Sequence, residues 1–265
     1  MGILNVTDDS FYDGGRYRTV ESALRHAETM ATDGADVIDI GAEKAGPGRP
    51  VSAAEEIERV VPVIDAIKQR LSIRLSVDTW KPEVAAAAVE AGAEIINSIG
   101  GFDDPAMRTV AAQTGTAIIL MHIQGRPRVH QPNPKYADVV SDVTDWLTAR
   151  AALCVESGIS PERIMIDPGP GFGKTSEHDL DLIRHIDTLT ALPYPVVLAA
   201  SRKPFIGAVL GDEVEDRIEG SLAVVAWGVQ QGVKLVRVHD VRATVRVVRM
   251  VEAVLRACWP VEESV

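Results

Sequence analysis

The sequence contains little cysteine and fewer basic than acidic side chains. Only Cys154 and Cys258 occur among 265 residues, which argues against a disulfide framework or a cysteine-based metal site. Lys and Arg number 27 against 38 Asp and Glu, for a formal net charge of −11, and a protein that grips nucleic-acid phosphates is usually basic. Neither a transmembrane-length apolar run nor a secretory signal pattern is present. We therefore expect a cytoplasmic protein with no nucleic-acid and no membrane partner.

Short apolar segments alternate with longer segments of helical period along the chain. We predict strands at residues 2–7, 36–41, 74–79, 94–99, 117–122, 163–168, 195–201 and 234–239. One helix is expected after each, including 177–190 after the sixth strand and 217–232 after the seventh. Such strict alternation is typical of a parallel sheet covered by helices.

Eight such units indicate closure into a barrel. A Gly-x-Gly-x-x-Gly motif, which would favour an open dinucleotide-binding sheet, is absent after the first strand. The chain length of 265 residues suits one such barrel. We predict an α/β fold, a single-domain (β/α)₈ TIM barrel over residues 1–260, followed by a disordered acidic tail at 261–265.

Nearly every predicted strand ends in a polar residue. In a (β/α)₈ barrel these carboxyl ends face the catalytic mouth. Any one such residue is equally well explained as a buried, hydrogen-bonded group, but burying eight without partners would cost roughly 1–3 kcal/mol each. We therefore predict one shared polar site from Asn5, Asp39, Asp78, Asn97, His122, Asp167, Ser201, Arg237 and His239.

Three loops after these strands also favour a ligand site. A polar, Gly-containing loop at 8–15 is suited to a lid. Glycines at 169–173 permit close approach of backbone to a ligand. At the seventh strand, Ser201, Arg202 and Lys203 open a helix and place a hydroxyl, two cations and free N–H groups together, which predicts an anion site.

Six segments make a specific resemblance to a known family. GILNVTDDSFYDGG, SVDT, MHIQGRPR…NPKYADVV, IDPGPGFGK, SRKPFIG and RVHDV resemble the motifs of the dihydropteroate synthase family, in the same order. That family condenses 6-hydroxymethyl-7,8-dihydropterin diphosphate with para-aminobenzoate to 7,8-dihydropteroate and diphosphate in folate biosynthesis, and sulfonamide drugs target it. The resemblance covers essentially the whole chain and implies a transferase that binds these two small molecules.

Carried over by position, the resemblance implies a pterin pocket. Asp167 would accept hydrogen bonds from the 2-aminopyrimidinone edge, because a fixed carboxylate suits adjacent N–H donors. The other pterin residues would be Asp78, Asn97, Phe172, Lys203 and Arg237.

The resemblance also implies a diphosphate site and a second-substrate site. Magnesium is the expected cofactor, with Asn5 as its ligand, and the diphosphate would contact Asn5, Arg237 and His239. The aminobenzoate would contact Phe11, Pro47, Ser201 and Lys203. The catalytic set would be Asn5, Asp78, Lys203, Arg237 and His239.

One loop departs from the family pattern. Where the family reads Glu-Ser-Thr-Arg-Pro-Gly after the second strand, this chain reads Glu43-Lys44-Ala45-Gly46-Pro47-Gly48. Loss of an Arg contact to an anion removes roughly 1.5–3 kcal/mol, although Lys44 or Arg49 could supply a charge. Three functions follow as hypotheses: an active synthase, a pterin-binding paralogue with little or no synthase activity, and a methyltetrahydrofolate-binding methyltransferase domain. The family also implies a homodimer through the late helices, 218–231 and 241–257.

Overall fold

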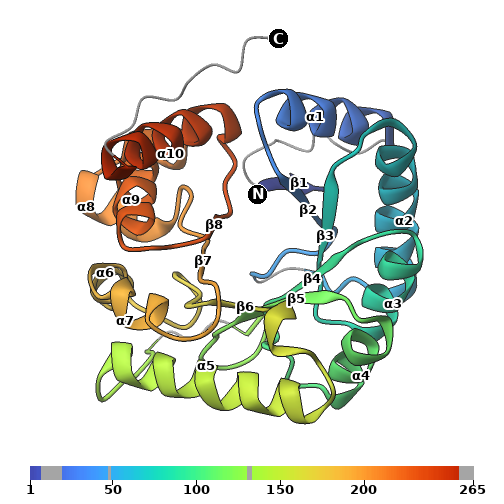
Figure 1. Ribbon diagram of the computed structural model, residues 1–265, viewed down its shortest axis with the longest axis horizontal. Coiled ribbons are helices and arrows are strands. Elements are labelled where there is room, and N and C mark those ends of the chain that lie inside the picture. The colour runs from blue at the N-terminus through green and yellow to red at the C-terminus, as the bar shows by residue number, and fades with distance from the viewer. Residues whose placement is uncertain (7–19, 47–48, 130–132, 257–265) are drawn as a thin grey trace.

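The computed structural model describes residues 1–6, 20–46, 49–129 and 133–256, and in them the chain forms a closed barrel (Figure 1). Six parallel strands, β1 to β6, pair in chain order, and β7 pairs with β8. Single parallel bridges, Ile166 to Val196 and Gly2 to Val238, join the two sheets at both edges. The strands are β1 Gly2–Asn5, β2 Val37–Gly41, β3 Arg74–Asp78, β4 Ile95–Ser98, β5 Ala117–Met121, β6 Ile164–Asp167, β7 Val197–Leu198 and β8 Leu235–Val236. The predicted (β/α)₈ fold is confirmed.

Every observed strand lies inside its predicted range but is shorter. The difference is largest for β7 and β8, which are two residues long each. A residue belongs to a parallel ladder only while the neighbouring strand continues beside it. Because β7 and β8 meet their outer neighbours only at single bridges, the apolar pattern overestimates their length.

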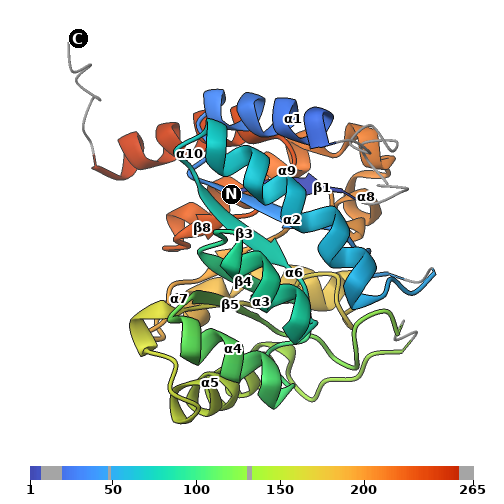
Figure 2. The ribbon, with the colours of Figure 1, turned by 90° about the vertical axis from the view of Figure 1, so that its right-hand side faces the viewer.

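The helices form the outer ring, and α2, α3 and α4 cover the outer faces of the middle strands (Figure 2). They are α1 Val20–Thr32, α2 Ala53–Arg70, α3 Pro82–Glu90, α4 Pro105–Thr114, α5 Val139–Glu156, α6 Ser176–Arg184, α7 Ile186–Thr190, α8 Pro204–Leu210, α9 Ile218–Gln230 and α10 Val241–Arg256. The prediction of one helix per strand is wrong in two places. His185 leaves the helical conformation (φ −107°, ψ 29°) and divides 177–190 into α6 and α7, and α8 is an additional short helix after β7.

Side chains alternate along each strand between the surrounding helices and the barrel interior. On β2, Ile38 and Ile40 join the large core beneath the helices, whereas Val37 belongs to a smaller apolar cluster within the barrel. The inward positions change from apolar to polar toward the carboxyl ends: Ile95 is followed two residues later by Asn97 on β4, and Met165 by Asp167 on β6. Leu235 on β8 is likewise followed by Arg237. The interior is thus an apolar plug below a polar mouth.

Among the described residues, no helix combines the length and the apolar composition that a membrane span requires. The tail predicted at 261–265 and Cys258 lie outside the described residues.

Candidate active site

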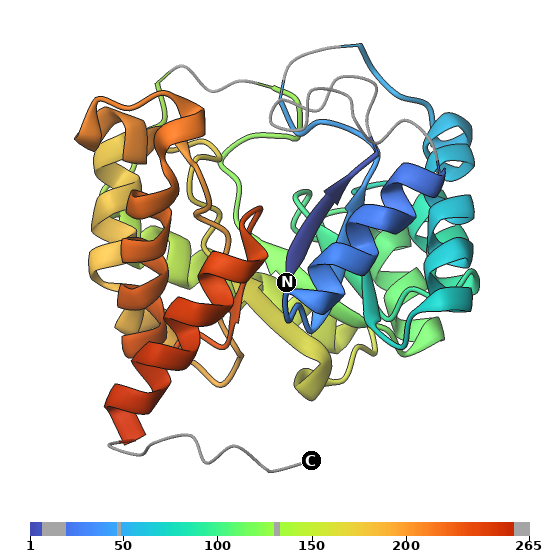
Figure 3. The same cartoon turned by 90° about the horizontal axis from the view of Figure 1, so that it is seen from above.

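The strand register places several of the predicted site residues in one row across the mouth. Asn5 pairs with Gly41, Gly41 with Asp78, and Asp78 with Asn97. Side chains at paired positions of a parallel sheet point to the same face. Gly41 leaves the place between Asn5 and Asp78 without a side chain. The segments that follow β2 and β5 rise at this same end of the barrel (Figure 3).

Arg237 binds two carboxylates in the mouth, and one of them also accepts from an amide. Its Nε donates to Asp39 Oδ2 (2.6 Å) and its Nη2 to Asp78 Oδ2 (2.8 Å). Asn97 Nδ2 donates to the same Asp39 oxygen (3.0 Å). Residues from β2, β3 and β4 and the residue that follows β8 therefore meet in one ionic network. With its nitrogen held by Asp39, the Asn97 amide presents its oxygen as an acceptor.

Asp39 is the residue whose importance the sequence alone did not reveal. It was one of the nine residues predicted to form the polar site, but no ligand role was assigned to it. It is fully buried, and its Oδ1 has no hydrogen-bond partner among the described residues. Its other oxygen orients Asn97 and Arg237. The available signal was its position near the carboxyl end of the second predicted strand, which placed Asp39 in the shared polar site.

Asp167 lies at the end of β6 and is 2% exposed. Its Oδ1 accepts a hydrogen bond from the backbone N–H of Gly169 (2.7 Å). Burial raises the pKa of Asp167 to about 6, against the opposing effects of that hydrogen bond and of the nearby Lys203, Arg237 and Lys174. Its Oδ2 has no partner among the described residues, so it can accept donors from a ligand.

Gly169 allows the loop after β6 to turn directly beneath the site. Its φ is +64°, and a Cβ at this position would stand 2.1 Å from the carbonyl oxygen of His122. Any other residue would therefore combine left-handed backbone strain with a severe contact. The glycines at 169–173 thus allow the loop after β6 to pack closely against the segment after β5, in addition to the predicted approach to a ligand.

Lys174 fastens that loop and was missed by the sequence argument. Its Nζ lies 2.8 Å from His122 Nδ1 and donates to the carbonyl oxygens of Gly169 (3.0 Å) and Phe172 (3.1 Å). Burial lowers the pKa of Lys174 to about 7. Burial and Lys174 together lower the pKa of His122 to about 3, so the imidazole is neutral and can accept from the ammonium.

Lys203 and Phe172 approach each other across the mouth. The Lys203 Nζ stands 4.0 Å from the centre of the Phe172 ring, a distance that favours a cation–π contact. Burial, and then Arg237, lower the pKa of Lys203 to about 8. The side chain is therefore still mostly protonated at neutral pH. No hydrogen bond joins Nζ to another described residue, which leaves its donors available to a ligand.

Ser201 and Arg202 follow β7, and their side chains contact different partners. The Ser201 hydroxyl lies 3.3 Å from both the backbone nitrogen and Nδ1 of His239. Arg202 is 7% exposed and binds both carboxylate oxygens of Asp240 (2.8 and 2.9 Å), and it also donates to the backbone carbonyl oxygens of Val214 and Glu215. The prediction that two cations from this cluster face an anion is therefore wrong for Arg202. The contact predicted between Ser201 and aminobenzoate stays a prediction.

His239 and Asn5 complete the described part of the mouth. Burial and Arg237 lower the pKa of His239 to about 4, so at neutral pH this side chain can offer an N–H but not a positive charge. Asn5 is partly exposed at the end of β1. Phe11 and Pro47, both predicted at the aminobenzoate pocket, lie outside the described residues.

A separate cavity of about 720 Å³ lies beside the mouth, over the ends of α4 and α5. Trp80, His122 and Trp146 are among the residues that line it, whereas Asp167 and Arg237 are not. The mouth and this cavity share His122, which packs edge-on against Trp146 with ring centres 5.0 Å apart. Trp80 and Trp146 thus contribute to a surface next to the polar site and do not line it.

The assembled mouth has a defined chemical capacity. Asp167 Oδ2 and the Asn97 oxygen are fixed acceptors, which suit a flat heterocycle with neighbouring N–H donors. Lys203 and Arg237 add positive charge close to those acceptors, which suits an anionic group on the same ligand. None of Asp167, Asn97, Lys203 and Arg237 is a hydroxyl or thiol nucleophile. The arrangement favours binding and electrostatic stabilisation over covalent catalysis.

Comparisons with known proteins find similar chains of one family. Residues 1–239 match the family described as "Pterin binding enzyme". The chain is 46% identical over 257 residues to a dihydropteroate synthase of Bacillus subtilis, covering 96% of this chain and 88% of that protein. It superposes on a Yersinia pestis dihydropteroate synthase in a sulfonamide complex with TM-score 0.93 at 41% identity, covering 97% and 93% of the two chains. A Xanthomonas albilineans dihydropteroate synthase in complex with 7,8-dihydropteroate gives TM-score 0.87 at 41% identity, covering 96% and 92%.

Proposed function

We propose that this chain, which belongs to the dihydropteroate synthase family, condenses 6-hydroxymethyl-7,8-dihydropterin diphosphate with para-aminobenzoate to give 7,8-dihydropteroate and diphosphate. The observation that carries the proposal is the acceptor pair of Asp167 and Asn97, set beside the cations of Lys203 and Arg237. That combination matches a donor-rich pterin edge joined to an anionic leaving group. Relatives that cover nearly the whole chain support the same reaction.

The pterin would be held by its ring. Asp167 Oδ2 and the Asn97 oxygen accept from the N–H groups of the aminopyrimidinone edge, while Lys203 donates to the carbonyl side. Phe172, whose ring centre lies 4.0 Å from Lys203 Nζ, would border the ring plane. Asp78, already bonded to Arg237, completes the recognition of ring N–H groups. These side chains arise at the ends of different strands, so the barrel itself fixes their spacing.

The reaction needs charge stabilisation at the departing group. The bond between the pterin methylene carbon and the diphosphate oxygen breaks, and the electron pair leaves with the diphosphate. The amine nitrogen of para-aminobenzoate bonds to the same carbon and loses a proton. Arg237 and protonated Lys203 place positive charge near the departing oxygens, and His239 offers a neutral N–H donor. Such preorganised donors lower the barrier without reorganisation during the reaction.

Magnesium is the proposed cofactor, with Asn5 as its protein ligand. Asn5, partly exposed at the end of β1, offers an amide oxygen at the mouth, whereas no group of three or more His, Cys, Asp or Glu side chains in the described ranges could hold a metal by itself. Mg²⁺ commonly takes one or two protein oxygens and completes its shell with water and substrate phosphates. An amide oxygen at the mouth therefore suits magnesium that arrives with the diphosphate. When bound, the ion would neutralise charge on the departing group.

The proposed reaction is tested by diphosphate release. We expect release that requires the dihydropterin diphosphate, para-aminobenzoate and Mg²⁺ together, measured in a coupled diphosphate assay. Omission of any one of the three should reduce release to the background rate. A chain that binds the pterin in calorimetry but releases no diphosphate with all three present would instead be the non-synthase paralogue, which the Ala45-Gly46 departure already raises as the second candidate.

We further propose a homodimer formed through α9 and α10. Trp227, Met250 and Val254 are 40%, 64% and 66% exposed, and all three line one shallow groove between these helices. Large apolar side chains gathered on one face mark an interaction surface. Val254→Glu should convert a dimer to a monomer in sedimentation velocity, whereas Val209→Glu on α8, at a valine that is 59% exposed, should not. A wild-type chain that sediments as a monomer would contradict the proposal.

We also propose a reducing, cytoplasmic location. Cys154 is buried and free, and burial raises the pKa of its thiol to about 11, which suits a packing residue rather than a redox partner.

A further inference from the structure

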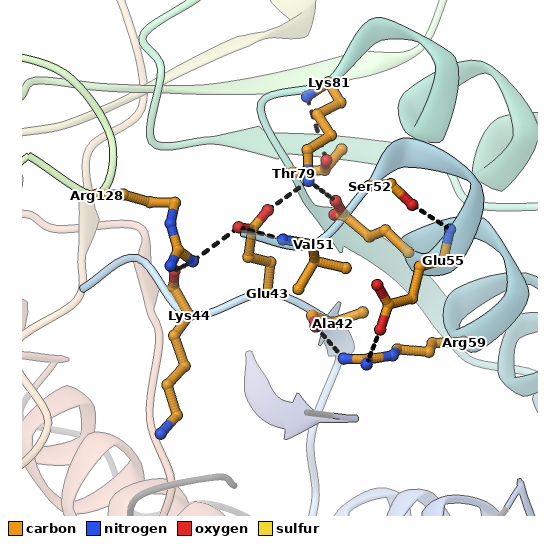
Figure 4. A network of polar contacts seen from close by, with 11 residues as sticks. Ala42, Glu43, Lys44, Val51, Ser52, Glu55, Arg59, Thr79, Lys81 and Arg128 are labelled. Atoms are coloured by element: carbon orange, nitrogen blue, oxygen red, sulfur yellow. Dashed lines mark hydrogen bonds and ion pairs between the residues drawn. The ribbon is translucent and has the colours of Figure 1, made fainter. Parts of the chain in front are cut away.

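Glu43, the first residue of the departing loop, is buried in a network of charged residues. Its side chain is 2% exposed, and its carboxylate accepts from Arg128 Nη1 (2.7 Å), from the backbone of Val51 (3.2 Å) and from Lys81 Nζ. Lys81 Nζ also donates to Glu56 on α2 (2.5 Å). Figure 4 shows these side chains converging on Glu43 from separate elements.

Arg128 contacts the loop after β2 from a distant part of the chain. It lies after β5, 85 positions from Glu43, and its backbone N–H donates to the carbonyl oxygen of Ala45 (3.0 Å). The guanidinium Nη1 donates to the Lys44 carbonyl oxygen (3.2 Å) as well as to Glu43. Arg128 thus holds three consecutive residues of the loop after β2.

Lys44 and Arg49, the two cations that could replace the charge of the missing loop arginine, form no ion pair with Glu43 in the described part of the chain. The Lys44 side chain extends away from Glu43 (Figure 4). Arg49 forms an ion pair with Glu55 at the start of α2. Arg128, by contrast, is partly buried at 16% side-chain exposure and paired with a carboxylate that is almost inaccessible to solvent. A charge pair in such a place is screened little by water.

We propose that Arg128 is a positioning residue for the second substrate: by holding Glu43, Lys44 and Ala45 from the loop after β5, it supplies the anchor that the loop after β2 lacks in its own sequence. The anchored residues lie directly before Gly46 and Pro47, the latter assigned to the aminobenzoate pocket by the family resemblance. Arg128 acts through the loop and touches neither substrate. The kinetic part of this inference rests on the proposed function.

The contacts of Arg128 also predict how far a lysine can replace it. Its Nη2 is buried and has no hydrogen-bond partner in the described part of the chain. Only one terminal nitrogen of the guanidinium therefore holds the loop, and a lysine ammonium can reproduce the contact with Glu43. A glutamine at 128 cannot supply the charge. Both replacements keep the left-handed backbone (φ +67°) as strained as arginine does, so backbone strain does not confuse the comparison.

The test compares Arg128→Gln, Arg128→Lys and the control Arg126→Gln, an exposed arginine of the same loop. For Arg128→Gln we expect the KM for para-aminobenzoate to rise about tenfold, as loss of a charge-assisted hydrogen bond implies. The pterin Kd from calorimetry should change less than about twofold, because the pterin residues are untouched. Arg128→Lys should recover most of the loss, and Arg126→Gln should behave as wild type.

A second measurement is independent of turnover. Trypsin should cut the Lys44–Ala45 bond about tenfold faster in Arg128→Gln than in wild type, identified by mass spectrometry, because the anchored conformation protects that bond. Glu43→Gln should give the same increase from the other side of the contact. If both variants are folded and neither changes this cleavage rate, the anchor is refuted. An equal loss of affinity for pterin and aminobenzoate would show general destabilisation and would refute positioning as well. If the wild-type chain has no synthase activity, the cleavage rates still decide.

Discussion

Replacing Asp167 by Asn is expected to weaken pterin binding about a hundredfold or more, since two charge-assisted hydrogen bonds of roughly 1.5–3 kcal/mol each are at stake. Asp167 Oδ2 has no partner among the described residues and is the acceptor proposed for the ligand. The substituted amide retains an oxygen for the Gly169 N–H at 2.7 Å, so the loop after β6 should keep its course. Isothermal calorimetry with a dihydropterin measures the effect.

The same substitution should not destabilise the barrel at neutral pH. Burial raises the pKa of Asp167 to about 6 in the folded chain, above the value of about 3.9 for an unfolded aspartate. The folded state therefore favours the protonated form, and the stability associated with this group is lost as the pH rises from about 4 through about 6. That loss amounts to roughly 2–3 kcal/mol. An asparagine at this position cannot ionise, so the variant avoids this loss of stability. Its buried NH₂ group must be desolvated, which offsets part of the stability gained.

Thermal melts across pH separate the two effects. The Tm of Asp167→Asn minus that of wild type should increase between about pH 4 and pH 7 and then level off. Asp187→Asn, at an exposed aspartate of α7, should show no such trend and should bind pterin normally. Unchanged pterin affinity in Asp167→Asn would remove this residue from the proposed pocket.

Arg237→Gln is expected to cost about 3–5 kcal/mol of stability, because removal of one partner leaves buried charge uncompensated. Arg237 is the hydrogen-bonding cation for both Asp39 and Asp78. Burial already raises the pKa of Asp78 to about 7, with Arg237 as the largest opposing influence. Without Arg237 the pKa of Asp78 should rise further in the folded state, so the loss of stability should be greater at about pH 8 than at about pH 5. Differential scanning calorimetry at both pH values checks the sign.

Activity should fall further than stability explains. Loss of a preorganised donor at a developing negative charge typically lowers kcat about 10²–10³-fold, which stopped-time diphosphate assays below the melting range can measure. The double variant Arg237→Gln/Asp39→Asn should regain part of the lost Tm but not activity, because it removes one of the two carboxyl groups that lost their cation without restoring that cation. The matched control is Arg249→Gln at an exposed arginine of α10. Near-normal kcat in a folded Arg237→Gln chain would contradict the proposed mechanism.

The apolar pattern of the sequence predicted the barrel well, because the burial of each strand and helix determines which of its own residues are apolar. All eight strand positions, from Gly2–Asn5 to Leu235–Val236, fall within the ranges read from apolar periodicity. The polar residues at the strand ends also predicted that Asn97, Asp167 and Arg237 belong to one polar site at the mouth. Where local signals were weak, as at His185 between α6 and α7, the helix count was wrong. Nothing in residues 177–190 marks that break, since the helical apolar pattern continues through it.

The sequence by itself determined the eightfold alternation, the polar strand ends and the family motifs, because these depend on residues a few positions apart. Tertiary structure alone decided the partners: Asp39 beneath Asn97 and Arg237, Lys174 against His122, Arg202 turned to Asp240, and Arg128 on Glu43. Each of these pairs forms only when the closed barrel brings distant strand ends to one mouth. The buried charges then pair with opposite charges or hydrogen-bonding groups that are distant in the sequence, so the sequence alone does not predict which residues pair.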